Sequence, residues 1–196
     1  QEFKSSGLKH FYDVIWRVYH ALMSVGSALV ITLSPFIARV LMQRQFYSAW
    51  PLISILVLAF YLSAINNFLG TIYQAYMRTK PLLVATVVGA VACLAFTAVL
   101  VHDWGISAAA FGVFVGSLVI FVIRVIDVRR LMTINMRPIP TAITMTLLTV
   151  QSLVTSNQCS HYLFWSSICL LLIAFVQCYE LKPLITLIFT RRKYTA

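Results

Sequence analysis

The sequence predicts an all-α membrane protein with about six transmembrane helices. Of its 196 residues, 61% are hydrophobic and only 10% are charged, and the mean hydropathy is +0.89. A soluble domain keeps roughly a quarter of its residues charged, so this chain has too little polar surface to cover itself in water. Its apolar residues gather into long uninterrupted runs, which are typical of membrane helices and not of barrel strands.

Each apolar run is long enough to cross a bilayer, because the hydrocarbon core takes about 20 mostly apolar residues. No run contains Asp, Glu or Lys. The predicted spans cover residues 21–42, 50–73, 82–101, 106–126, 139–156 and 161–179. They define a six-helix region at 21–179. The basic cytoplasmic tail that follows, 180–196, has a short apolar run that we expect to anchor at the membrane surface.

The segment before the first span, 1–20, has the pattern of an amphipathic helix. Apolar residues recur at helical spacing on one side, while Lys9, Asp13 and Arg17 form i, i+4 pairs on the other. We predict an interfacial helix that lies along the cytoplasmic membrane surface and then turns into the first span. The alternative is one long first helix that protrudes from the bilayer.

Lysine and arginine are unequally shared between the two sides of the predicted bundle. Twelve of the 15 lie before the first span, in the second and fourth links or in the tail, and Arg124, near the end of the fourth span, makes thirteen on that side; only Arg39 and Arg44 lie on the other side. Cytoplasmic flanks carry such an excess, so both chain ends are expected in the cytoplasm. Because the charges flank membrane spans, the net charge of +10 indicates contact with membrane lipids, and we predict no nucleic-acid partner.

The sequence does not have the pattern of an enzyme. An intramembrane hydrolase needs paired acids, a histidine cluster or a nucleophile with its base, and no ionisable residue lies deep in a predicted span. His10 and His20 are expected at the inner surface, and His102 and His161 at the outer ends of spans. The four cysteines show no Cys-x-x-Cys spacing. We therefore predict no catalytic residue, no metal site and no cofactor.

Two features inside the spans are candidates for function. Pro35, in the second half of the first span, removes one backbone hydrogen bond and kinks the helix; this suits a hinge, but purely structural kinks have the same origin. Asn66 and Asn67 lie past the middle of the second span. Adjacent amides in lipid must face a neighbouring helix or a cavity, so they are predicted either to hold helices together or to line a cavity.

The link between the third and fourth spans is a short turn, 101–105, followed by small residues that let two helix backbones approach closely. With its surroundings, this hairpin resembles the polysaccharide-unit flippases of bacterial cell envelopes, in the multidrug/oligosaccharidyl-lipid/polysaccharide exporter superfamily. The matching residues are Thr79-Lys80 at the family's Thr-Lys or Gly-Lys flank, Leu100-Val101-His102 at its Leu-Ile-Pro-like turn, and Gly105-Ile106-Ser107-Ala108-Ala109 at its Gly-x-x-Gly-Ala-Ala position.

The resemblance is best over 73–130 and looser over 1–130, while 139–196 follows the family in hydropathy alone. Cys93 and Thr97 stand where the family commonly has asparagines. The family implies a two-lobed bundle of about twelve to fourteen helices that alternates between inward-open and outward-open states. Its flippase branch moves undecaprenyl-diphosphate-linked oligosaccharides across the bacterial inner membrane for lipopolysaccharide, O-antigen and other surface polysaccharides.

The resemblance also implies partners. This chain would form most of the second, C-terminal lobe, and it would act with the missing N-terminal lobe, a lipid-linked oligosaccharide and the polysaccharide polymerase machinery. The closest alternative is a cation-coupled multidrug exporter of the same superfamily, which is distinguished by an acidic residue deep in a helix. A membrane subunit or enzyme of envelope polysaccharide assembly is a further alternative.

A diphosphate cargo gains most from guanidinium or ammonium groups in a partly dehydrated cavity. The resemblance therefore makes Arg39 a candidate cargo contact, with Arg78 and Lys80 as inner-face candidates and the Asn66-Asn67 pair as cavity lining. Each charged residue has a plainer alternative. Arg39 would reach the outer headgroups, and Arg78 and Lys80 would be ordinary topology signals.

Overall fold

The computed structural model describes residues 2–41, 50–131, 138–156 and 161–193, with side chains described over 11–40, 50–130, 139–156 and 161–182. These residues form helices without strands. The helices are α1 (Glu2–Leu41), α2 (Trp50–Ala75), α3 (Thr79–Trp104), α4 (Ile106–Leu131), α5 (Pro138–Ser156) and α6 (Tyr162–Lys193). Within this part of the chain, the predicted all-α class is confirmed.

Every one of the six helices is long and apolar enough to cross a membrane. Helices form along these segments because the backbone N–H and C=O groups of a chain in lipid must be satisfied within the chain itself. Each helix contains the greater part of one predicted span. The chain is therefore a multi-pass membrane protein.

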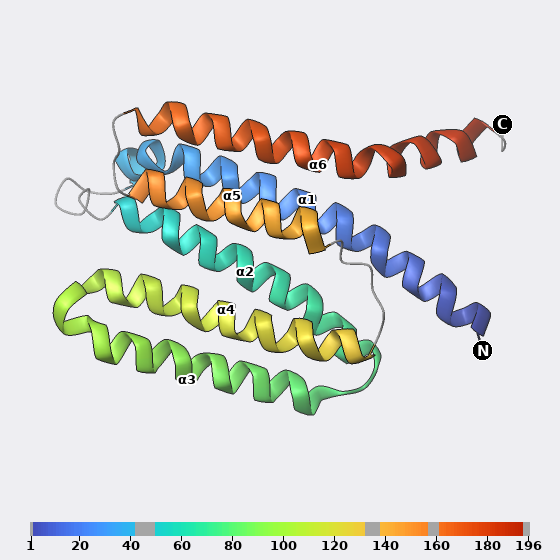
Figure 1. The fold of residues 1–196 in the computed structure, drawn as a ribbon, viewed down its shortest axis with the longest axis horizontal. Helices are drawn as coiled ribbons and strands as arrows, with labels where there is room; N and C mark the ends of the chain where they lie inside the picture. Colours follow the sequence, from blue (N-terminus) through green and yellow to red (C-terminus); the bar gives the residue numbers. More distant parts are fainter. Residues whose placement is uncertain (1, 42–49, 132–137, 157–160, 194–196) are drawn as a thin grey trace.

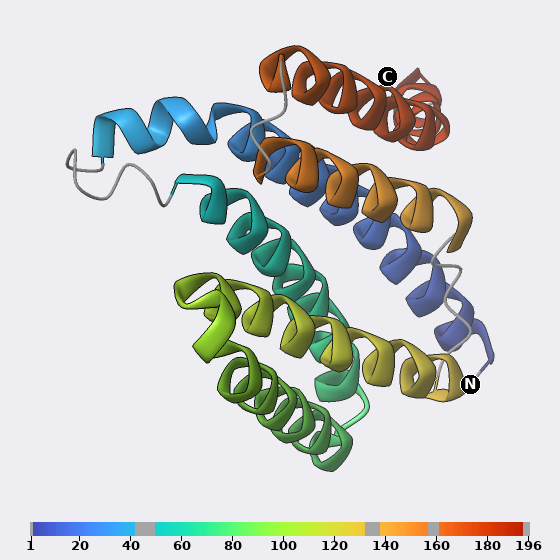
Figure 2. The same ribbon diagram turned by 60° about the vertical axis from the view of Figure 1, so that its left-hand side comes forward.

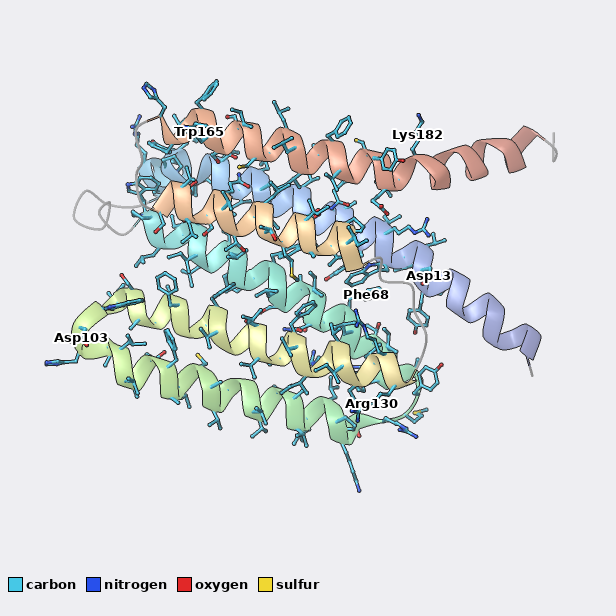
Figure 3. All side chains as sticks on the ribbon, in the orientation of Figure 1. Asp13, Phe68, Asp103, Arg130, Trp165 and Lys182 are labelled. Carbon is cyan, nitrogen blue, oxygen red and sulfur yellow. The ribbon has the colours of Figure 1, made fainter. Side chains whose placement is uncertain are left out.

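Successive helices run antiparallel, so the bundle has two distinct ends (Figure 1). The N- and C-termini and the α2–α3 link lie at one end, which we call the terminal end. The α3–α4 turn lies at the opposite end, which we call the turn end. Figure 3 labels Arg130 and Lys182 toward the terminal end and Asp103 at the turn end.

Helix α2 occupies the centre of the bundle. It packs against α1, α4 and α5, whereas α3 packs mainly on α4, and α6 on α1 and α5. In the most apolar stretch of α2, 56% of the residues are buried inside the protein, compared with 11% in that of α3. The fully buried Ile65, Leu69 and Ile72 of α2 form the middle of the hydrophobic core. The outer face of α3, with exposed Leu83, Leu94 and other aliphatic residues, is a surface for lipid.

The α3–α4 hairpin is held together by very close backbone approach. A Cβ on Gly112 would lie 2.1 Å from Thr97 Oγ1, and one on Gly89 would lie 2.2 Å from Ile120 Cγ1. A Cβ on Gly116 would lie 2.8 Å from the carbonyl oxygen of Gly89. Only glycine fits at these positions, so the predicted close approach of the two helices is confirmed.

Helix α1 is continuous for 40 residues, from Glu2 to Leu41. It has no break at residues 20–21, so the interfacial helix predicted for 1–20 is not an element of its own, and the alternative of one long first helix agrees with the structure. The helix changes direction in its last third (Figure 2). Pro35 lies there, and the Ser34 hydroxyl donates to the carbonyl oxygen of Ile31 at 2.8 Å. That carbonyl is the one left without an i+4 N–H partner by Pro35, so the kink is locally satisfied.

Candidate functional site

A lateral groove lies between α4 and α5 and is floored by α2. Its first part has a volume of about 340 Å³. Leu58, Tyr61 and Leu62 of α2 form the floor, and the walls come from α4 and α5. The wall residues are Phe114, Leu118, Met145, Thr146 and Thr149. The surface is apolar apart from the hydroxyls of Tyr61 and the two threonines.

The groove continues toward the terminal end as a second part of about 190 Å³, which shares Met145 with the first. Its lining includes Trp16 of α1, Phe121 of α4 and Thr141 of α5. Arg129, in the last turn of α4, also lines this part. The groove therefore runs from an apolar region between the helices to a cation at the terminal end of the bundle.

Several basic residues lie at the terminal end of the bundle, and of these Arg129 lines the groove. Arg78 and Lys80 at the α2–α3 link and Arg129 and Arg130 at the end of α4 are all exposed. Arg39 is also exposed, but it lies in the last turn of α1, at the turn end of the bundle. The structure thus separates Arg39 from Arg78 and Lys80 by the length of the bundle, and it puts none of the three in the groove lining.

The two adjacent asparagines face different surroundings. Asn66 is buried, and its side-chain Nδ2 donates to the carbonyl oxygen of Ser117 on α4 at 2.9 Å. Asn67, about 100° further round α2, is exposed. Of the two roles that the sequence left open, Asn66 holds α2 against α4, and neither asparagine lines the groove.

Asn66 belongs to a polar junction around Arg124 of α4. Arg124 has only 6% of its surface exposed. Its guanidinium donates to the carbonyl oxygen of Asn66 and, at 3.0 Å, to the hydroxyl of Thr86 on α3. Arg124 therefore ties three helices together.

A second polar junction, centred on Gln151, connects α5 to α1 and α6. Gln151 is fully buried, and its Nε2 donates to the carbonyl oxygen of Ala28 at 2.9 Å. The same nitrogen lies 3.0 Å from Thr32 Oγ1 and 3.0 Å from Ser166 Oγ. The two hydroxyls lie 3.0 Å apart. Gln151 thus attaches α5 to its two neighbours, α1 and α6.

A third polar junction connects four helices through His20. The ring nitrogen Nε2 of His20 lies 3.0 Å from the hydroxyl of Tyr61 on α2, and Nδ1 lies 3.2 Å from Nε2 of Gln177 on α6. Gln177 in turn donates to Thr144 of α5 at 3.1 Å. All four side chains are buried. The prediction that His20 lies at the inner surface did not anticipate this burial.

Sequence reasoning missed these junctions because it placed Arg124 and His20 at the membrane boundary and did not single out Gln177 within the sixth predicted span. One signal was present. Trp16 and His20 continue, at i and i+4, the inward-facing stripe of the helix that follows, which indicates burial more than surface contact. The helix rotation that turns Gln177 toward the same point is not visible in hydropathy.

Among the described residues, no three histidines, cysteines or acidic residues lie close enough together to hold a metal ion. The features that could serve a function are an apolar groove with a cationic end and three buried polar junctions. Comparisons with protein-family models, with curated proteins and with solved structures found no match to this chain.

Proposed function

We propose that this chain is one lobe of an exporter that moves undecaprenyl-diphosphate-linked oligosaccharides across a bacterial inner membrane, with both chain ends in the cytoplasm. The observation that supports it is the polarity of the groove between α4 and α5, which is apolar along its length and cationic at its terminal end. A lipid-linked saccharide has the same polarity, because an apolar polyprenyl chain is joined to a diphosphate.

Cargo selection in this proposal comes from charge. A polyprenyl chain gains little hydrophobic free energy by moving from lipid into an apolar groove, since both surroundings are hydrocarbon. The diphosphate gains charge-assisted hydrogen bonds, which are about twice as strong as neutral ones. We infer that Arg129 makes them, because its guanidinium presents a bidentate fork at the groove mouth. Arg129 replaces Arg39 as the proposed contact to cargo.

The same groove disfavours the multidrug alternative. Cationic drugs need an acidic partner, and none of the described residues that line the groove is acidic. Arg129 would repel such drugs as they enter. An anionic lipid is the better match.

We also propose that a second lobe faces this groove. A groove open to lipid holds a chain but leaves a sugar head exposed to hydrocarbon, which a bilayer penalises. The N-terminal lobe expected from the family resemblance would supply the other wall of a hydrated cavity. Polysaccharide polymerase machinery would then receive the sugar units at the outer face.

Translocation in proteoliposomes tests the proposal. The complete protein is reconstituted with a fluorescent undecaprenyl-diphosphate saccharide, and an impermeant quencher reports how much of it has crossed the bilayer. Arg129→Gln is expected to lower the initial rate about tenfold, because the loss of a hydrogen bond to a charged group costs about 1.5–3 kcal/mol.

Arg130→Gln is the matched control. It removes the same charge from the adjacent position, but Arg130 is not among the groove-lining residues, so the parent rate is expected. If both variants lost the same fraction of the translocation rate, Arg129 would act only through the overall surface charge and not as a contact to cargo. A parent protein no faster than protein-free liposomes would contradict the proposed function itself.

A further inference from the structure

The His20 junction has a hydrogen-bond direction that the structure fixes. The Thr144 hydroxyl donates its one proton to the carbonyl oxygen of Pro140 at 2.8 Å. Its oxygen must therefore accept from Gln177, so the NH₂ group of Gln177 faces both Thr144 and His20. Nδ1 of His20 then accepts a hydrogen bond, and the proton of the neutral ring is on Nε2.

The remaining bond follows from this tautomer. With its proton on Nε2, His20 donates to the hydroxyl oxygen of Tyr61 at 3.0 Å. The four-residue junction is complete only while His20 is neutral. A proton added at Nδ1 would point at the NH₂ group of Gln177, donor against donor, and at least one bond between α1, α6 and α5 must then break or reverse.

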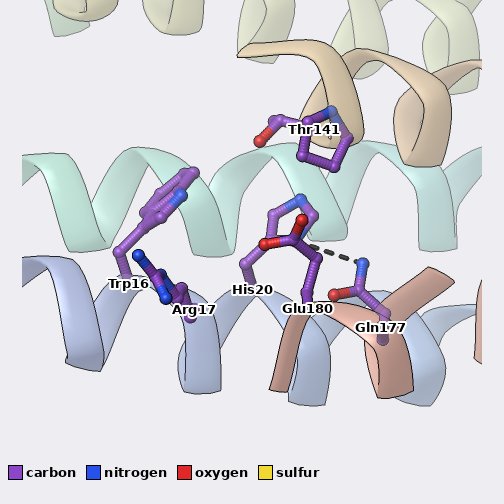
Figure 4. A pocket seen from close by; sticks show the side chains of 7 residues that line it. Trp16, Arg17, His20, Thr141, Gln177 and Glu180 are labelled. Atoms are coloured by element: carbon purple, nitrogen blue, oxygen red, sulfur yellow. Dashed lines mark hydrogen bonds between the residues drawn. The ribbon is translucent and has the colours of Figure 1, made fainter. Parts of the chain in front are cut away.

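A small cavity leads to His20 from the terminal side. Trp16, Arg17, Pro140, Thr141 and Glu180 line it together with His20 and Gln177 (Figure 4). Its volume of about 10 Å³ is close to that needed for one water molecule. Because a water held there would touch polar groups from three helices, a proton from the solvent at the terminal end has a short path to the ring.

Charged and aromatic groups surround His20. Glu180 of α6 lines the same small cavity as the His20 ring, and a carboxylate beside an imidazole favours its positive charge. Trp16 lies beside His20 with ring centroids 5.5 Å apart, a geometry in which the indole also attracts a cation. Arg17 on α1 opposes that charge, and Tyr61 on α2 and Thr144 on α5 are neutral. Asp13 lies about two helical turns before His20 on α1.

We propose that His20 is a proton-binding site, loaded from the terminal end, and that its protonation releases α6 from α1 and α5. Helix α6 suits this role because its inward face is only half apolar. Its buried residues among those described are Ser166, Cys169, Ile173 and Gln177. Loss of the Gln177 bonds therefore removes a large part of what holds this helix.

The site also adjoins the groove. Tyr61 accepts from His20 and lines the first part of the groove, and Trp16 and Thr141 line both the cavity and the second part. A change at His20 thus reaches the groove wall through side chains that the two share. The coupling to cargo rests on the proposed function, but the proton site itself does not.

Nitrogen NMR of histidine-labelled protein in nanodiscs tests the proton site without any cargo. At about pH 7.5, His20 is expected as the neutral ring with its proton on Nε2, and by about pH 5 both nitrogens are expected to be protonated. His20→Gln identifies the signal. His161→Gln is the control, since His161 is exposed at the start of α6 and its loss should leave the His20 signals unchanged.

Gln177→Glu keeps the size of the side chain and turns the donor into an acceptor. It is expected to raise the ratio of protonated to neutral His20 at least about tenfold at a given pH, because a carboxylate stabilises the charged ring. A His20 that stays neutral at about pH 5 in the parent, or an unchanged ratio in Gln177→Glu, would overturn the proton site.

Spin-label distances test the release of α6. Labels at Phe60 of α2 and Phe175 of α6, both lipid-facing, are introduced in a cysteine-free background. The distance is expected to shift or broaden by more than about 2 Å between pH 7.5 and pH 5 in the parent, and to stay constant in His20→Gln. Labels at Phe60 and Leu94 of α3 should not move. A protonated His20 with an unchanged α2–α6 distance would refute the release.

Discussion

At the residue scale, single polar groups in this protein act as attachments between helices. Arg124, His20 and Gln151 are each buried, and each bonds to at least two other helices. In lipid there is no hydrophobic driving force between helices, so hydrogen bonds and close van der Waals contact decide which helices associate. Such side chains are therefore expected to matter more for stability than the exposed leucines and valines around them.

Arg124→Gln tests this for one junction. The shorter amide cannot reach both the Asn66 carbonyl and the Thr86 hydroxyl, so we expect a loss of about 1.5–3 kcal/mol in unfolding free energy. Arg130→Gln, exposed at the end of the same helix, is expected to stay within about 0.5 kcal/mol of the parent. Thermal or denaturant unfolding in detergent measures both. Equal stabilities would mean that Arg124 is no attachment.

At the element scale, the α3–α4 hairpin and the kinked α1 show two uses of special backbone residues. Gly89, Gly112 and Gly116 remove side chains so that two helices touch along their backbones. Pro35 removes a hydrogen-bond donor, and Ser34 replaces it at the Ile31 carbonyl. The glycines set the close contact between α3 and α4, and the Ser34-Pro35 pair sets the change of direction in α1.

Gly112→Ala is expected to separate α3 from α4. Its Cβ would meet Thr97 Oγ1 at 2.1 Å, so we expect a destabilisation of about 1–3 kcal/mol. Thr97→Ala in the same protein should recover part of that loss, which a double-mutant cycle measures. Gly26→Ala is the control, because nothing lies within 4 Å of its Cβ, and it should be neutral or slightly stabilising. Equal effects at both glycines would contradict the close contact.

Pro35→Ala separates a hinge from a static kink. The alanine N–H can donate to the Ile31 carbonyl, so stability should stay equal or rise by up to about 1 kcal/mol. If Pro35 is a hinge, the translocation rate of the variant falls while its stability does not. A variant with the parent rate would make the kink purely structural.

At the scale of the whole molecule, the open groove predicts the effect of filling it. Thr149→Trp puts a large ring into the wall of the groove, whereas Leu94→Trp faces lipid from the outer side of α3. We expect the first variant to lose most translocation and the second to keep it. Unfolding transitions should be similar in both, since neither site is fully buried. Undiminished translocation by Thr149→Trp would exclude the groove as the cargo path.

Residues 1–196 by themselves test the two-lobe proposal. Expressed alone in a strain that lacks its own exporter, they are expected to insert into the membrane but not to restore surface polysaccharide, because the groove then faces lipid. The amount of surface polysaccharide per inserted protein is the measurement. Restoration by this segment would remove the need for a second lobe.

The sequence by itself determined the class of the protein, the number and order of its membrane helices among the described residues and the close α3–α4 contact. These depend on local quantities: the length of each apolar run and the spacing of small residues along two consecutive helices. It did not determine which polar residues face inward. Asn66 and Asn67 are neighbours in the sequence, yet one is buried against α4 and the other is exposed.

Only the tertiary structure decided the candidate site. Each residue turns a helix face by about 100°, so the surroundings of a side chain depend on how its helix is rotated against neighbours from distant parts of the chain. His20 and Gln177 are 157 residues apart, and Arg124 and Asn66 are 58 apart. Hydropathy averages over all faces of a helix and contains no term for such pairs, which is why Arg39 was favoured over Arg129 and why the His20 junction was missed.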